Sequence, residues 1–406
     1  MSGFGLLGEH LGHSMSPQLH AMIADYSYQL FEVAPDDLGE FLRTTELDGM
    51  NVTIPYKKAV IPYCTSLSER AARLGSVNTL VRRGDGWYGD NTDYSGFCCM
   101  LRRTGFSPAG KKGIVLGSGG AAKTVEAALR DLGAVEVVEI SRSGENNYNN
   151  LSKHADAQFI VNATPVGMYP YPDAKPVDAA DFPRCEAVYD LVYNPLKTEL
   201  LRSAETRNVI TSNGLCMLAA QAVDSAALFL GHPLPENCKD KALCRLFVDM
   251  RNIVLIGMPG CGKTTVGRLL AEKAGKSFID TDEEITKQTG RTPEELITGE
   301  GEDAFRDIET AVIAELSQRT GAVIACGGGA ALREENRIAL RRNGVIVWLQ
   351  RDLKLLETAG RPLSQREGLA GLYTERAPIY ESFADYTAEN VGTVDATADR
   401  ILEILK

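Results

Sequence analysis

The stretch Gly257–Thr265 reads GMPGCGKTT and fits the pattern G-x-x-x-x-G-K-[ST]. An apolar run, Asn252–Ile256, precedes it, and apolar residues at helical spacing follow it as far as Ala274. This order of strand, glycine-rich turn and helix is the context in which the pattern forms a phosphate-binding loop. Glycines let backbone N–H groups approach phosphate, and the helix N-terminus adds positive potential. The alternative, a chance glycine-rich turn, is disfavoured by the flanking strand and helix.

The loop predicts roles for individual residues. Lys263 is expected to reach the β- and γ-phosphates of a nucleotide, and the Thr264 hydroxyl to bind Mg²⁺. The residues expected to hold the nucleotide are Gly260, Gly262, Lys263, Thr264 and Thr265. ATP and Mg²⁺ are therefore predicted cofactors of this part of the chain.

Composition excludes several classes of protein. A chain of 406 residues, 44% hydrophobic and 24% charged, is typical of a globular protein with about two to three domains. Its net charge of −11, without a basic stripe, argues against a nucleic-acid partner. We find neither a signal-peptide pattern nor a run of about 18 apolar residues, so we expect a cytoplasmic protein without membrane contact. Nine scattered cysteines without a CxxC pair favour free thiols over disulfides or zinc.

Strand-like and helix-like runs alternate along the whole chain, which predicts an α/β fold with parallel sheets covered by helices. The predicted strands are residues 3–7, 28–33, 47–53, 76–82, 113–116, 135–140, 158–162, 187–191, 208–211 and 252–256. A linker-like stretch, Gly231–Asn237, and a helical segment near 239–249 lead into the last of these strands. The main domain boundary is therefore predicted near residue 250.

A second glycine-rich turn, Gly117–Lys123, follows the apolar residues 114–116 and leads into a helix. Such a turn holds the pyrophosphate of a dinucleotide. The next strand ends in Ser141-Arg142-Ser143, where a fold that binds NAD usually carries an acidic residue. An arginine between two hydroxyls suits the 2′-phosphate of NADP, whereas the alternative for Arg142 is an ordinary surface arginine.

Three polar stretches lie upstream of this turn. Ser14 and Ser16 stand just before a helix, where Ser16 followed by Pro17 fits an N-cap and Ser14 stays unexplained. Lys57 follows the end of a strand, and Asp93 opens a helix. Together these two residues could donate the proton that accompanies hydride transfer to a ketone. Taken singly, each would be a solvated charge or a helix cap.

In the second half, candidate acceptor-binding groups follow the phosphate loop. Asp280 could hold Mg²⁺ through water and Asp282 could deprotonate a hydroxyl, with a helix N-cap as the alternative. Three glycines, Gly327–Gly329, end another strand and leave only backbone to touch a ligand. Isolated arginines in defined contexts suit a carboxylate or a transferring phosphate, although any one could form a surface ion pair. These arginines are Arg306, Arg361 and Arg376.

The motifs HSMSP, NVTIPYK, GSVNTL, GDNTD, GSGGAAK, NATPVGM and NGLCMLAAQA occur in the order seen in shikimate dehydrogenases, which the chain resembles over roughly residues 1–247. The resemblance implies Lys57 and Asp93 as the catalytic pair, with Tyr193 nearby. It implies that the substrate is held by Ser14, Ser16, Thr53, Asn78 and Gln221. It implies an NADP site lined by Gly117, Gly119, Gly120, Ala121, Ser141, Arg142, Ser143, Leu191 and Gly214.

The chain departs from this family's pattern at three positions. Ser141 stands where Asn is usual, Tyr94 follows the catalytic aspartate where Gly is common, and Cys216 replaces a glycine near the nicotinamide. None of the three removes a catalytic group, but the last could alter the affinity for the cofactor.

The motifs DTD, GEDAFR, GGG, RPL and RAPIY resemble those of shikimate kinase across residues 251–406. The resemblance implies that shikimate is bound by Asp282, Arg306, Gly328, Gly329 and Arg376. It places Arg361 on a mobile lid that reaches ATP, and this lid, Gly360–Leu369, looks short.

Both resemblances together imply a bifunctional enzyme that reduces 3-dehydroshikimate with NADPH and then phosphorylates shikimate. The predicted domains are a substrate-binding domain (1–95 and 215–247), an inserted NADP-binding Rossmann domain (96–214) and a P-loop kinase domain (250–406). The expected partners are small molecules, and the sequence leaves open whether the chain forms a homo-oligomer. The alternatives are a dehydrogenase that uses quinate or NAD, and a non-catalytic sensor of quinate or shikimate.

Overall fold

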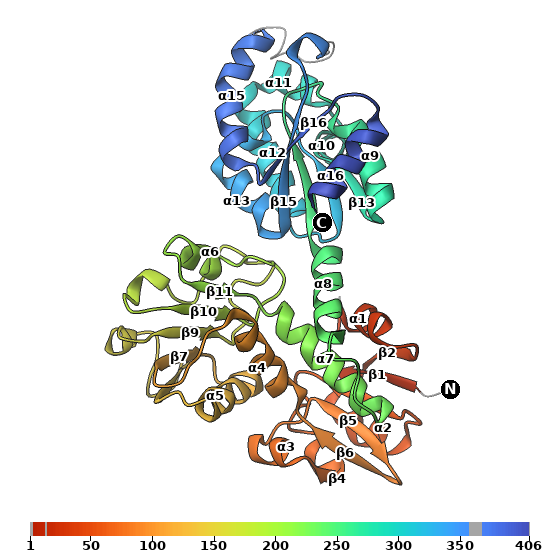
Figure 1. Cartoon of the computed structure of the whole chain (residues 1–406), viewed down its shortest axis with the longest axis vertical. Coiled ribbons are helices and arrows are strands. Elements are labelled where there is room, and N and C mark those ends of the chain that lie inside the picture. Colours follow the sequence, from red (N-terminus) through yellow and green to blue (C-terminus); the bar gives the residue numbers. More distant parts are fainter. Residues whose placement is uncertain (1–2, 13, 357–367, 406) are drawn as a thin grey trace. The chain divides into compact units, whose positions relative to one another are not determined.

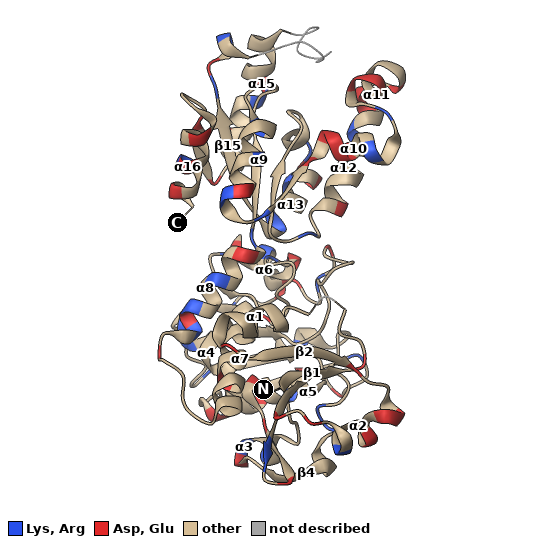
Figure 2. Ribbon diagram, turned by 90° about the vertical axis from the view of Figure 1, so that its right-hand side faces the viewer, with Lys and Arg blue, Asp and Glu red and all other residues tan. Residues whose placement is uncertain are grey.

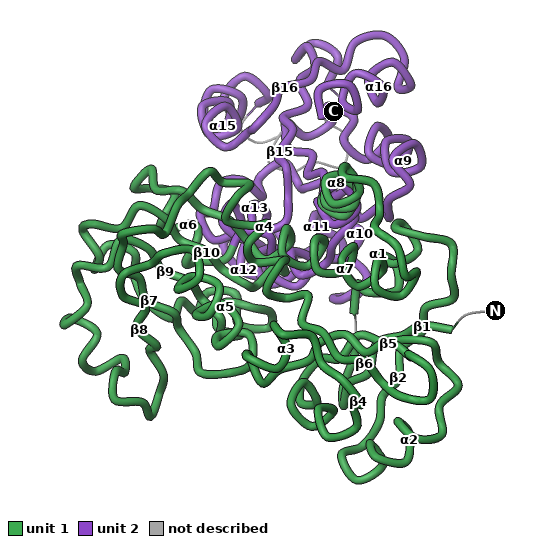
Figure 3. Tube along the Cα trace, turned by 60° about the horizontal axis from the view of Figure 1, so that its bottom comes forward, with its two compact units in different colours: residues 1–194, 198–247 green, residues 195–197, 248–406 purple. Residues whose placement is uncertain are grey.

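The computed structural model describes residues 3–12, 14–356 and 368–405. It divides into two compact units, which Figure 3 colours separately and Figure 1 labels by element. Unit 1 comprises residues 1–194 and 198–247, and unit 2 comprises residues 195–197 and 248–406. Both units are α/β, as the alternating pattern predicts. The finer division of unit 1 into a substrate-binding and a dinucleotide-binding domain stays a prediction.

The first sheet of unit 1 has the strand order β2-β1-β3-β5-β6-β4. Its elements are β1 (Gly3–Gly8), α1 (Ser16–Ile23), β2 (Ser27–Glu32), α2 (Leu38–Thr44), β3 (Gly49–Val52), β4 (Cys64–Leu67), α3 (Glu69–Leu74), β5 (Thr79–Arg83) and β6 (Gly86–Asp90). β1 pairs in parallel with both β2 and β3, as expected. Two other pairings, β3 with β5 and β5 with β6, are antiparallel. This sheet is therefore mixed: it contains the predicted parallel pairs and, in addition, antiparallel pairs that the alternating pattern does not predict.

The hairpin β5–β6 explains the antiparallel pairings. Only Gly84 and Asp85 join the two strands, and Gly84 has a φ of +57°, a conformation that tight hairpin turns require and glycine adopts freely. We predicted neither β4 nor β6 from the sequence. β6 contains two glycines and β4 carries two hydroxyl residues, so neither has the run of branched apolar side chains typical of strands.

The second sheet of unit 1 is parallel throughout, in the order β11-β10-β9-β7-β8. Its elements are β7 (Lys112–Leu116), α5 (Gly120–Asp131), β8 (Glu136–Ile140), β9 (Phe159–Asn162), β10 (Ala187–Asp190), α6 (Glu199–Glu205) and β11 (Ile210–Ser212). β9 and β10 are buried along their whole length, as strands covered on both faces must be. The chain reverses its direction of winding at β7, so the second glycine-rich turn opens at the switch point of the sheet.

Three further helices complete the chain up to the phosphate loop. They are α4 (Thr92–Thr104), α7 (Leu215–Leu230) and α8 (Cys238–Met250). α4 and α7 pack closely at Gly96 of α4. A Cβ atom at this position would lie only 2.8 Å from the carbonyl oxygen of Met217 in α7, so the close approach requires glycine. The helical segment predicted near 239–249 corresponds to α8.

Unit 2 contains one parallel sheet in the order β13-β14-β12-β15-β16. Its strands are β12 (Asn252–Ile256), β13 (Ser277–Asp280), β14 (Ala322–Ala325), β15 (Gly344–Gln350) and β16 (Tyr386–Glu389). Its helices are α9 (Lys263–Ala274), α10 (Thr281–Thr289), α11 (Pro293–Glu300), α12 (Glu302–Leu316), α13 (Glu334–Asn343), α15 (Leu369–Phe383) and α16 (Val394–Ile404). The fully buried β12 lies at the centre of the sheet, and the phosphate loop starts at its carboxyl end.

Charged residues of both signs are distributed along the chain. Figure 2 shows Lys and Arg interspersed with Asp and Glu along the described helices, without a basic stripe. Within the described ranges, we find no helix with the length and apolarity needed to cross a lipid bilayer.

The close packing of β7 against β9 leads to a stability prediction. A Cβ atom at Gly113 would lie 2.0 Å from the ring of Phe159, a buried neighbour that cannot move aside. We expect Gly113→Ala to destabilise unit 1 by about 1–3 kcal/mol through overpacking. Thermal or urea unfolding, monitored together with kinase turnover as a probe of unit 2, measures the effect.

The matched control is Gly119→Ala, because a Cβ atom there meets nothing within 4 Å. Equal unfolding midpoints for the two variants would contradict the packing argument.

Candidate functional site

The phosphate loop of unit 2 holds its lysine close to its own backbone. Gly257, Gly260 and Gly262 have φ values of +142°, +81° and +100°, which non-glycine residues rarely adopt. Lys263 opens α9 and is buried, and its Nζ donates hydrogen bonds to the carbonyl oxygens of Gly257 at 2.9 Å and Met258 at 3.0 Å. The ammonium group therefore lies over the loop in which phosphate would be held.

A hydroxyl and a carboxylate meet beside the loop. Thr264 Oγ1 donates to Asp280 Oδ2 at 2.6 Å, while Asp280 Oδ1 accepts from the backbone N–H of Asp282 at 3.0 Å. Asp280 is thus the N-cap of α10, the alternative interpretation of this residue, and its role toward Mg²⁺ stays a prediction. Oxygen donors of this kind fit Mg²⁺, which takes one or two protein oxygens and completes its shell with water and phosphate. Among the described residues there is no cluster of three or more His, Cys, Asp or Glu that could hold a metal.

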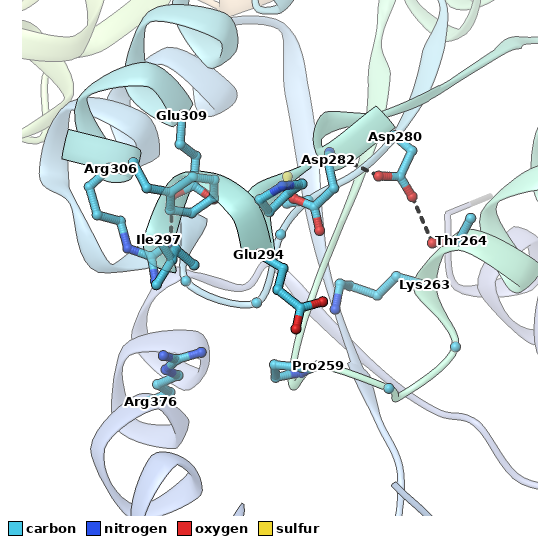
Figure 4. A pocket seen from close by; sticks show the side chains of 18 of the residues that line it. Pro259, Lys263, Thr264, Asp280, Asp282, Glu294, Ile297, Arg306, Glu309 and Arg376 are labelled. Atoms are coloured by element: carbon cyan, nitrogen blue, oxygen red, sulfur yellow. Dashed lines mark hydrogen bonds and ion pairs between the residues drawn. The ribbon is translucent and has the colours of Figure 1, made fainter. Parts of the chain in front are cut away.

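A cavity of about 420 Å³ opens next to the loop (Figure 4). It is lined from the phosphate loop, from α11 and α12, from the three-glycine turn after β14, and from α15. Five of the residues predicted for the kinase substrate line it: Asp282, Arg306, Gly328, Gly329 and Arg376. The structure therefore brings this set together from four separate stretches of sequence.

Among the carboxylates that line the cavity, Asp282 is the predicted general base, and its pKa suits that role. Its pKa is raised to about 6, first by burial and then by the negative charges of Asp280 and Glu309, while Lys263 and Arg306 oppose the shift. A carboxylate with such a pKa is ionised at neutral pH and is a stronger base than an exposed aspartate.

Two arginines form the opposite side of the cavity. Arg306 is held by Glu309, with Nη1 2.7 Å from Oε2, and by Glu302 at 3.1 Å. Burial raises the pKa of Glu309, and Arg306 opposes that shift. Arg376 is buried as well, and its Nε has no hydrogen-bond partner among the described residues. These guanidinium groups can bind a carboxylate.

The three-glycine turn is glycine for steric reasons. A Cβ atom on Gly327 would lie 2.8 Å from both Asp282 Oδ1 and Glu309 Oε1, and one on Gly329 would lie 2.1 Å from Arg306 Nη2. The hydroxyl of Tyr380 in α15 donates to the carbonyl oxygen of Gly328 and fixes the turn. A side chain at Gly327 or Gly329 would displace these charged groups.

Some of the cavity wall was not anticipated. Pro259, Glu294, Ile297 and Arg351 line the cavity, and Figure 4 shows Glu294 pointing into it from α11. A capping box between Thr292 and Glu295 starts that helix, so the sequence marks the helix but not the direction of its side chains. Arg361 and most of the predicted lid lie outside the described residues.

In unit 1 the predicted catalytic pair meets. Lys57 Nζ lies 2.6 Å from Asp93 Oδ2, although 36 residues separate them in sequence. Asn78 Nδ2 donates to Asp93 Oδ1 at 3.0 Å and its Oδ1 accepts from the N–H of Thr92 at 2.7 Å. One carboxylate oxygen therefore faces the ammonium group, while an amide fixes the other.

A buried network of hydrogen bonds is connected to the pair Lys57–Asp93 through Asn78. Ser225 of α7 shares hydrogen bonds with Thr79, Thr92 and Asn51 at 2.8–2.9 Å. The Asn78 side chain accepts from the Thr79 hydroxyl at 3.0 Å, which joins the network to Asp93. Ser225 and Thr79 are missing from the predicted site because hydroxyl residues in apolar stretches carry no local signal of their partners.

The other side chains predicted to hold the dehydrogenase substrate make hydrogen bonds to residues close to them in sequence, where such bonds are described. Ser14 Oγ accepts from the backbone N–H of Ser16 at 3.2 Å, and the two hydroxyls lie 3.2 Å apart. The expectation that Ser16 is the N-cap is wrong, because Ser16 is the first residue of α1. Ser14 instead accepts the hydrogen bond from the N–H group of this first residue. Gln221 donates to the carbonyl oxygen of Leu218 in its own helix, and burial raises the pKa of Tyr193. Thr53 is only partly exposed.

The second glycine-rich turn has the form expected of a dinucleotide loop. Gly117 has a φ of +109°, and α5 begins at Gly120 without a side-chain cap. Ala121 lies in its first turn. Leu191 and Gly214 lie against each other, because a Cβ on Gly214 would be 2.1 Å from the Leu191 carbonyl oxygen. Ser141, Arg142 and Ser143 follow β8, with Arg142 and Ser143 exposed, so the structure leaves the two interpretations of Arg142 open.

The departures from the family pattern find different neighbours. Tyr94 donates from its hydroxyl to Asp131 Oδ2 at 2.7 Å, and its pKa is raised to about 12, first by burial and then by that carboxylate. Cys216 is buried in a hydrophobic cluster with Val115 and Ala122. Ser141 donates its backbone N–H to Asn146.

Comparison with known proteins identifies the family of unit 1. Residues 6–80 match the shikimate dehydrogenase substrate binding domain. A shikimate dehydrogenase (NADP(+)) from Synechocystis is 34% identical over 271 residues, which are 59% of this chain and 93% of that protein. The chain belongs to the shikimate dehydrogenase family. Residues 259–406 match the shikimate kinase family, so the chain joins a shikimate dehydrogenase part to a shikimate kinase domain.

Solved structures similar to the chain cover the dehydrogenase part. A chorismate mutase/shikimate 5-dehydrogenase fusion protein from Clostridium acetobutylicum is 35% identical with a TM-score of 0.58, over 61% of this chain and 97% of that one. Shikimate 5-dehydrogenase from Thermus thermophilus, in complex with NADP(H) and shikimate, is 32% identical with a TM-score of 0.55, over 60% of this chain and 99% of that one.

The raised pKa of Asp282 predicts the pH dependence of the kinase domain. Below a pH of about 6 the carboxyl group becomes protonated and cannot accept a proton, so kcat/KM should fall about tenfold per pH unit there. Above that value the base is ionised and activity should be level. Initial rates with saturating Mg-ATP between about pH 5 and 8 measure this limb.

Glu309→Gln is the discriminating variant. It removes a negative charge that raises the pKa of Asp282, so the limb should move to lower pH, whereas ionisation of ATP would be unaffected. A limb that stays at the same pH in this variant would contradict the assignment to Asp282.

Proposed function

We propose that this chain catalyses two consecutive reactions of the shikimate pathway. Unit 1 reduces 3-dehydroshikimate to shikimate with NADPH, and unit 2 transfers the γ-phosphoryl group of ATP to the 3-hydroxyl of shikimate. The observation that carries the proposal is that both sites are equipped: the pair Lys57–Asp93 at 2.6 Å, and a cavity in which Asp282 faces Arg306 and Arg376 beside the phosphate loop. The product of the first reaction is the acceptor of the second.

In the dehydrogenase, NADPH would supply the hydride to the carbonyl carbon. Lys57 donates a proton to the carbonyl oxygen as negative charge develops there, and a hydroxyl group results. Asp93 accepts a hydrogen bond from the ammonium group and orients it, while Asn78 prevents the carboxylate from rotating. Ser14, Ser16, Thr53, Tyr193 and Gln221 are the proposed substrate-binding residues.

In the kinase, Mg-ATP would supply the phosphoryl group, with Thr264 and Asp280 as the proposed protein oxygens for the metal. Asp282 accepts the proton of the attacking hydroxyl, which its raised pKa favours. Lys263 neutralises charge on the phosphates. Arg306 and Arg376 hold the substrate carboxylate, and Arg361 is proposed to reach ATP. Gly260, Gly262 and Thr265 complete the nucleotide loop.

NADP rather than NAD is the proposed cofactor because of Ser141, Arg142 and Ser143 after β8. A cationic side chain between hydroxyls compensates the charge of a 2′-phosphate. Relatives differ here: the Listeria monocytogenes enzyme, 28% identical with a TM-score of 0.54, was solved in complex with shikimate and NAD. Use of quinate is the other alternative, and rates with shikimate and quinate with each cofactor decide between them. A non-catalytic sensor is disfavoured because the chain keeps Lys57 and Asp93 in contact.

Variants in each unit should separate the two activities. Lys57→Ala removes the proton donor and should lower dehydrogenase kcat by about 10²- to 10⁴-fold while kinase turnover stays near wild type. Lys263→Ala should do the reverse, because it removes the charge over the phosphate loop. Equal losses of both activities in either variant would count against two independent sites.

The consecutive reactions can be tested in one vessel. When 3-dehydroshikimate, NADPH and Mg-ATP are supplied together, we expect shikimate 3-phosphate to accumulate and NADPH and ATP to be consumed in equal amounts. Omission of ATP should stop the sequence at shikimate. Mass spectrometry of the products checks both statements, and accumulation of shikimate in the presence of ATP would remove the kinase half of the proposal.

A further inference from the structure

Ser76 carries a buried hydroxyl that no described contact explains. The residue is 1% exposed, and among the described residues its Oγ has no hydrogen-bond partner. Its backbone is held on both sides, since its N–H donates to Ala71 at 3.4 Å and its carbonyl oxygen accepts from Asn91 Nδ2 at 3.0 Å. An unpaired buried hydroxyl costs free energy that a partner would restore.

The hydroxyl faces the start of the dinucleotide helix. A Cβ atom at Gly120 would have Ser76 Oγ as its one contact within 4 Å, at 3.6 Å. Gly120 is the first residue of the 12-residue helix α5, whose N-cap makes no side-chain hydrogen bond. Because Gly120 has no side chain, no side chain of residue 120 lies between the Ser76 hydroxyl and the first turn of α5. Gly117 and Gly119 allow the turn to adjust when a ligand binds.

We propose that Ser76 is a further phosphate-binding residue of this site, whose hydroxyl donates a hydrogen bond to the pyrophosphate of the dinucleotide at the N-terminus of α5. The inference rests on the proposed role of Gly117–Ala121 in holding NADP. Uncapped N–H groups and a helix N-terminus attract this anion, and a hydroxyl donor adds to them. The segment also carries Asn78, two residues on, which fixes Asp93. The same short segment thus contacts the cofactor and the catalytic pair.

Direct binding measurements test this role. Titration of the full-length enzyme with NADP⁺ and with NAD⁺, followed by protein fluorescence or calorimetry, gives both Kd values. Ser76→Ala should weaken both cofactors about tenfold, because the two share the pyrophosphate. Arg142→Ala should weaken NADP⁺ and leave NAD⁺ unchanged, because it acts at the 2′-phosphate. The unfolding midpoint of unit 1, to which both residues belong, reports whether each variant is folded.

Stability supplies a second readout that a merely structural serine would not give. Ser76→Ala removes an unsatisfied buried group, so the unfolding midpoint of the free enzyme should not fall below that of wild type. The rise in this midpoint on adding NADP⁺ should be smaller than in wild type. A lower midpoint of the free enzyme with an unchanged rise would assign Ser76 to packing and overturn the proposal.

Gly120→Ala provides a matched variant. Its Cβ fits at 3.6 Å from Ser76 Oγ but covers the hydroxyl, so it should weaken cofactor binding, and Ser76→Ala should add little to it. Additive losses would show that the two residues act separately. Unchanged Kd values in Ser76→Ala, with a loss in Arg142→Ala, would reject Ser76 and keep the cofactor site. Unchanged values in both would count against the proposed site as a whole.

Discussion

The attraction between phosphate and the N-terminus of a helix determines how both units of this protein are built. In each unit an inner strand of a parallel sheet, β7 or β12, ends in a glycine-rich turn. The following helix begins without a side-chain cap, at Gly120 in one unit and at Lys263 in the other. Positive φ angles at Gly117 and Gly262 let the turn close. The first backbone N–H groups of each helix are left for a ligand, and the strand order places these turns at a switch point.

Several charged side chains of the two sites are buried or partly buried and form ion pairs. Lys57 with Asp93, and Arg306 with Glu309, are pairs in which each ion offsets the burial of the other. The pKa of Asp282 is raised first by burial and then by the negative charges of Asp280 and Glu309. In unit 1 the ion pair contains the proposed proton donor, Lys57, whereas in unit 2 the proposed base, Asp282, stands outside the Arg306–Glu309 pair.

Much of the fold and of both sites could be predicted from the sequence, but not all. Strand and helix patterns located β1, β3 and β12 because these strands are apolar and bounded by turn residues. The weakly apolar strands β4 and β6 were not predicted, and neither was the antiparallel part of the first sheet, which contains β6. The glycine motifs predict where phosphates bind. They do not predict a role for Ser76, because its proximity to Gly120 joins two stretches that are far apart in the sequence.

The sequence by itself determined the two phosphate loops, the family of each part and the residue types available for chemistry, because these depend on local spacing. Only the tertiary structure decided which groups meet: that Asn78 and a network around Ser225 fix Asp93, that Glu309 holds Arg306, and that Glu294 points into the kinase cavity. The physical reason is that these contacts join residues far apart in the chain. Their geometry follows from the packing of sheets and helices rather than from any local pattern.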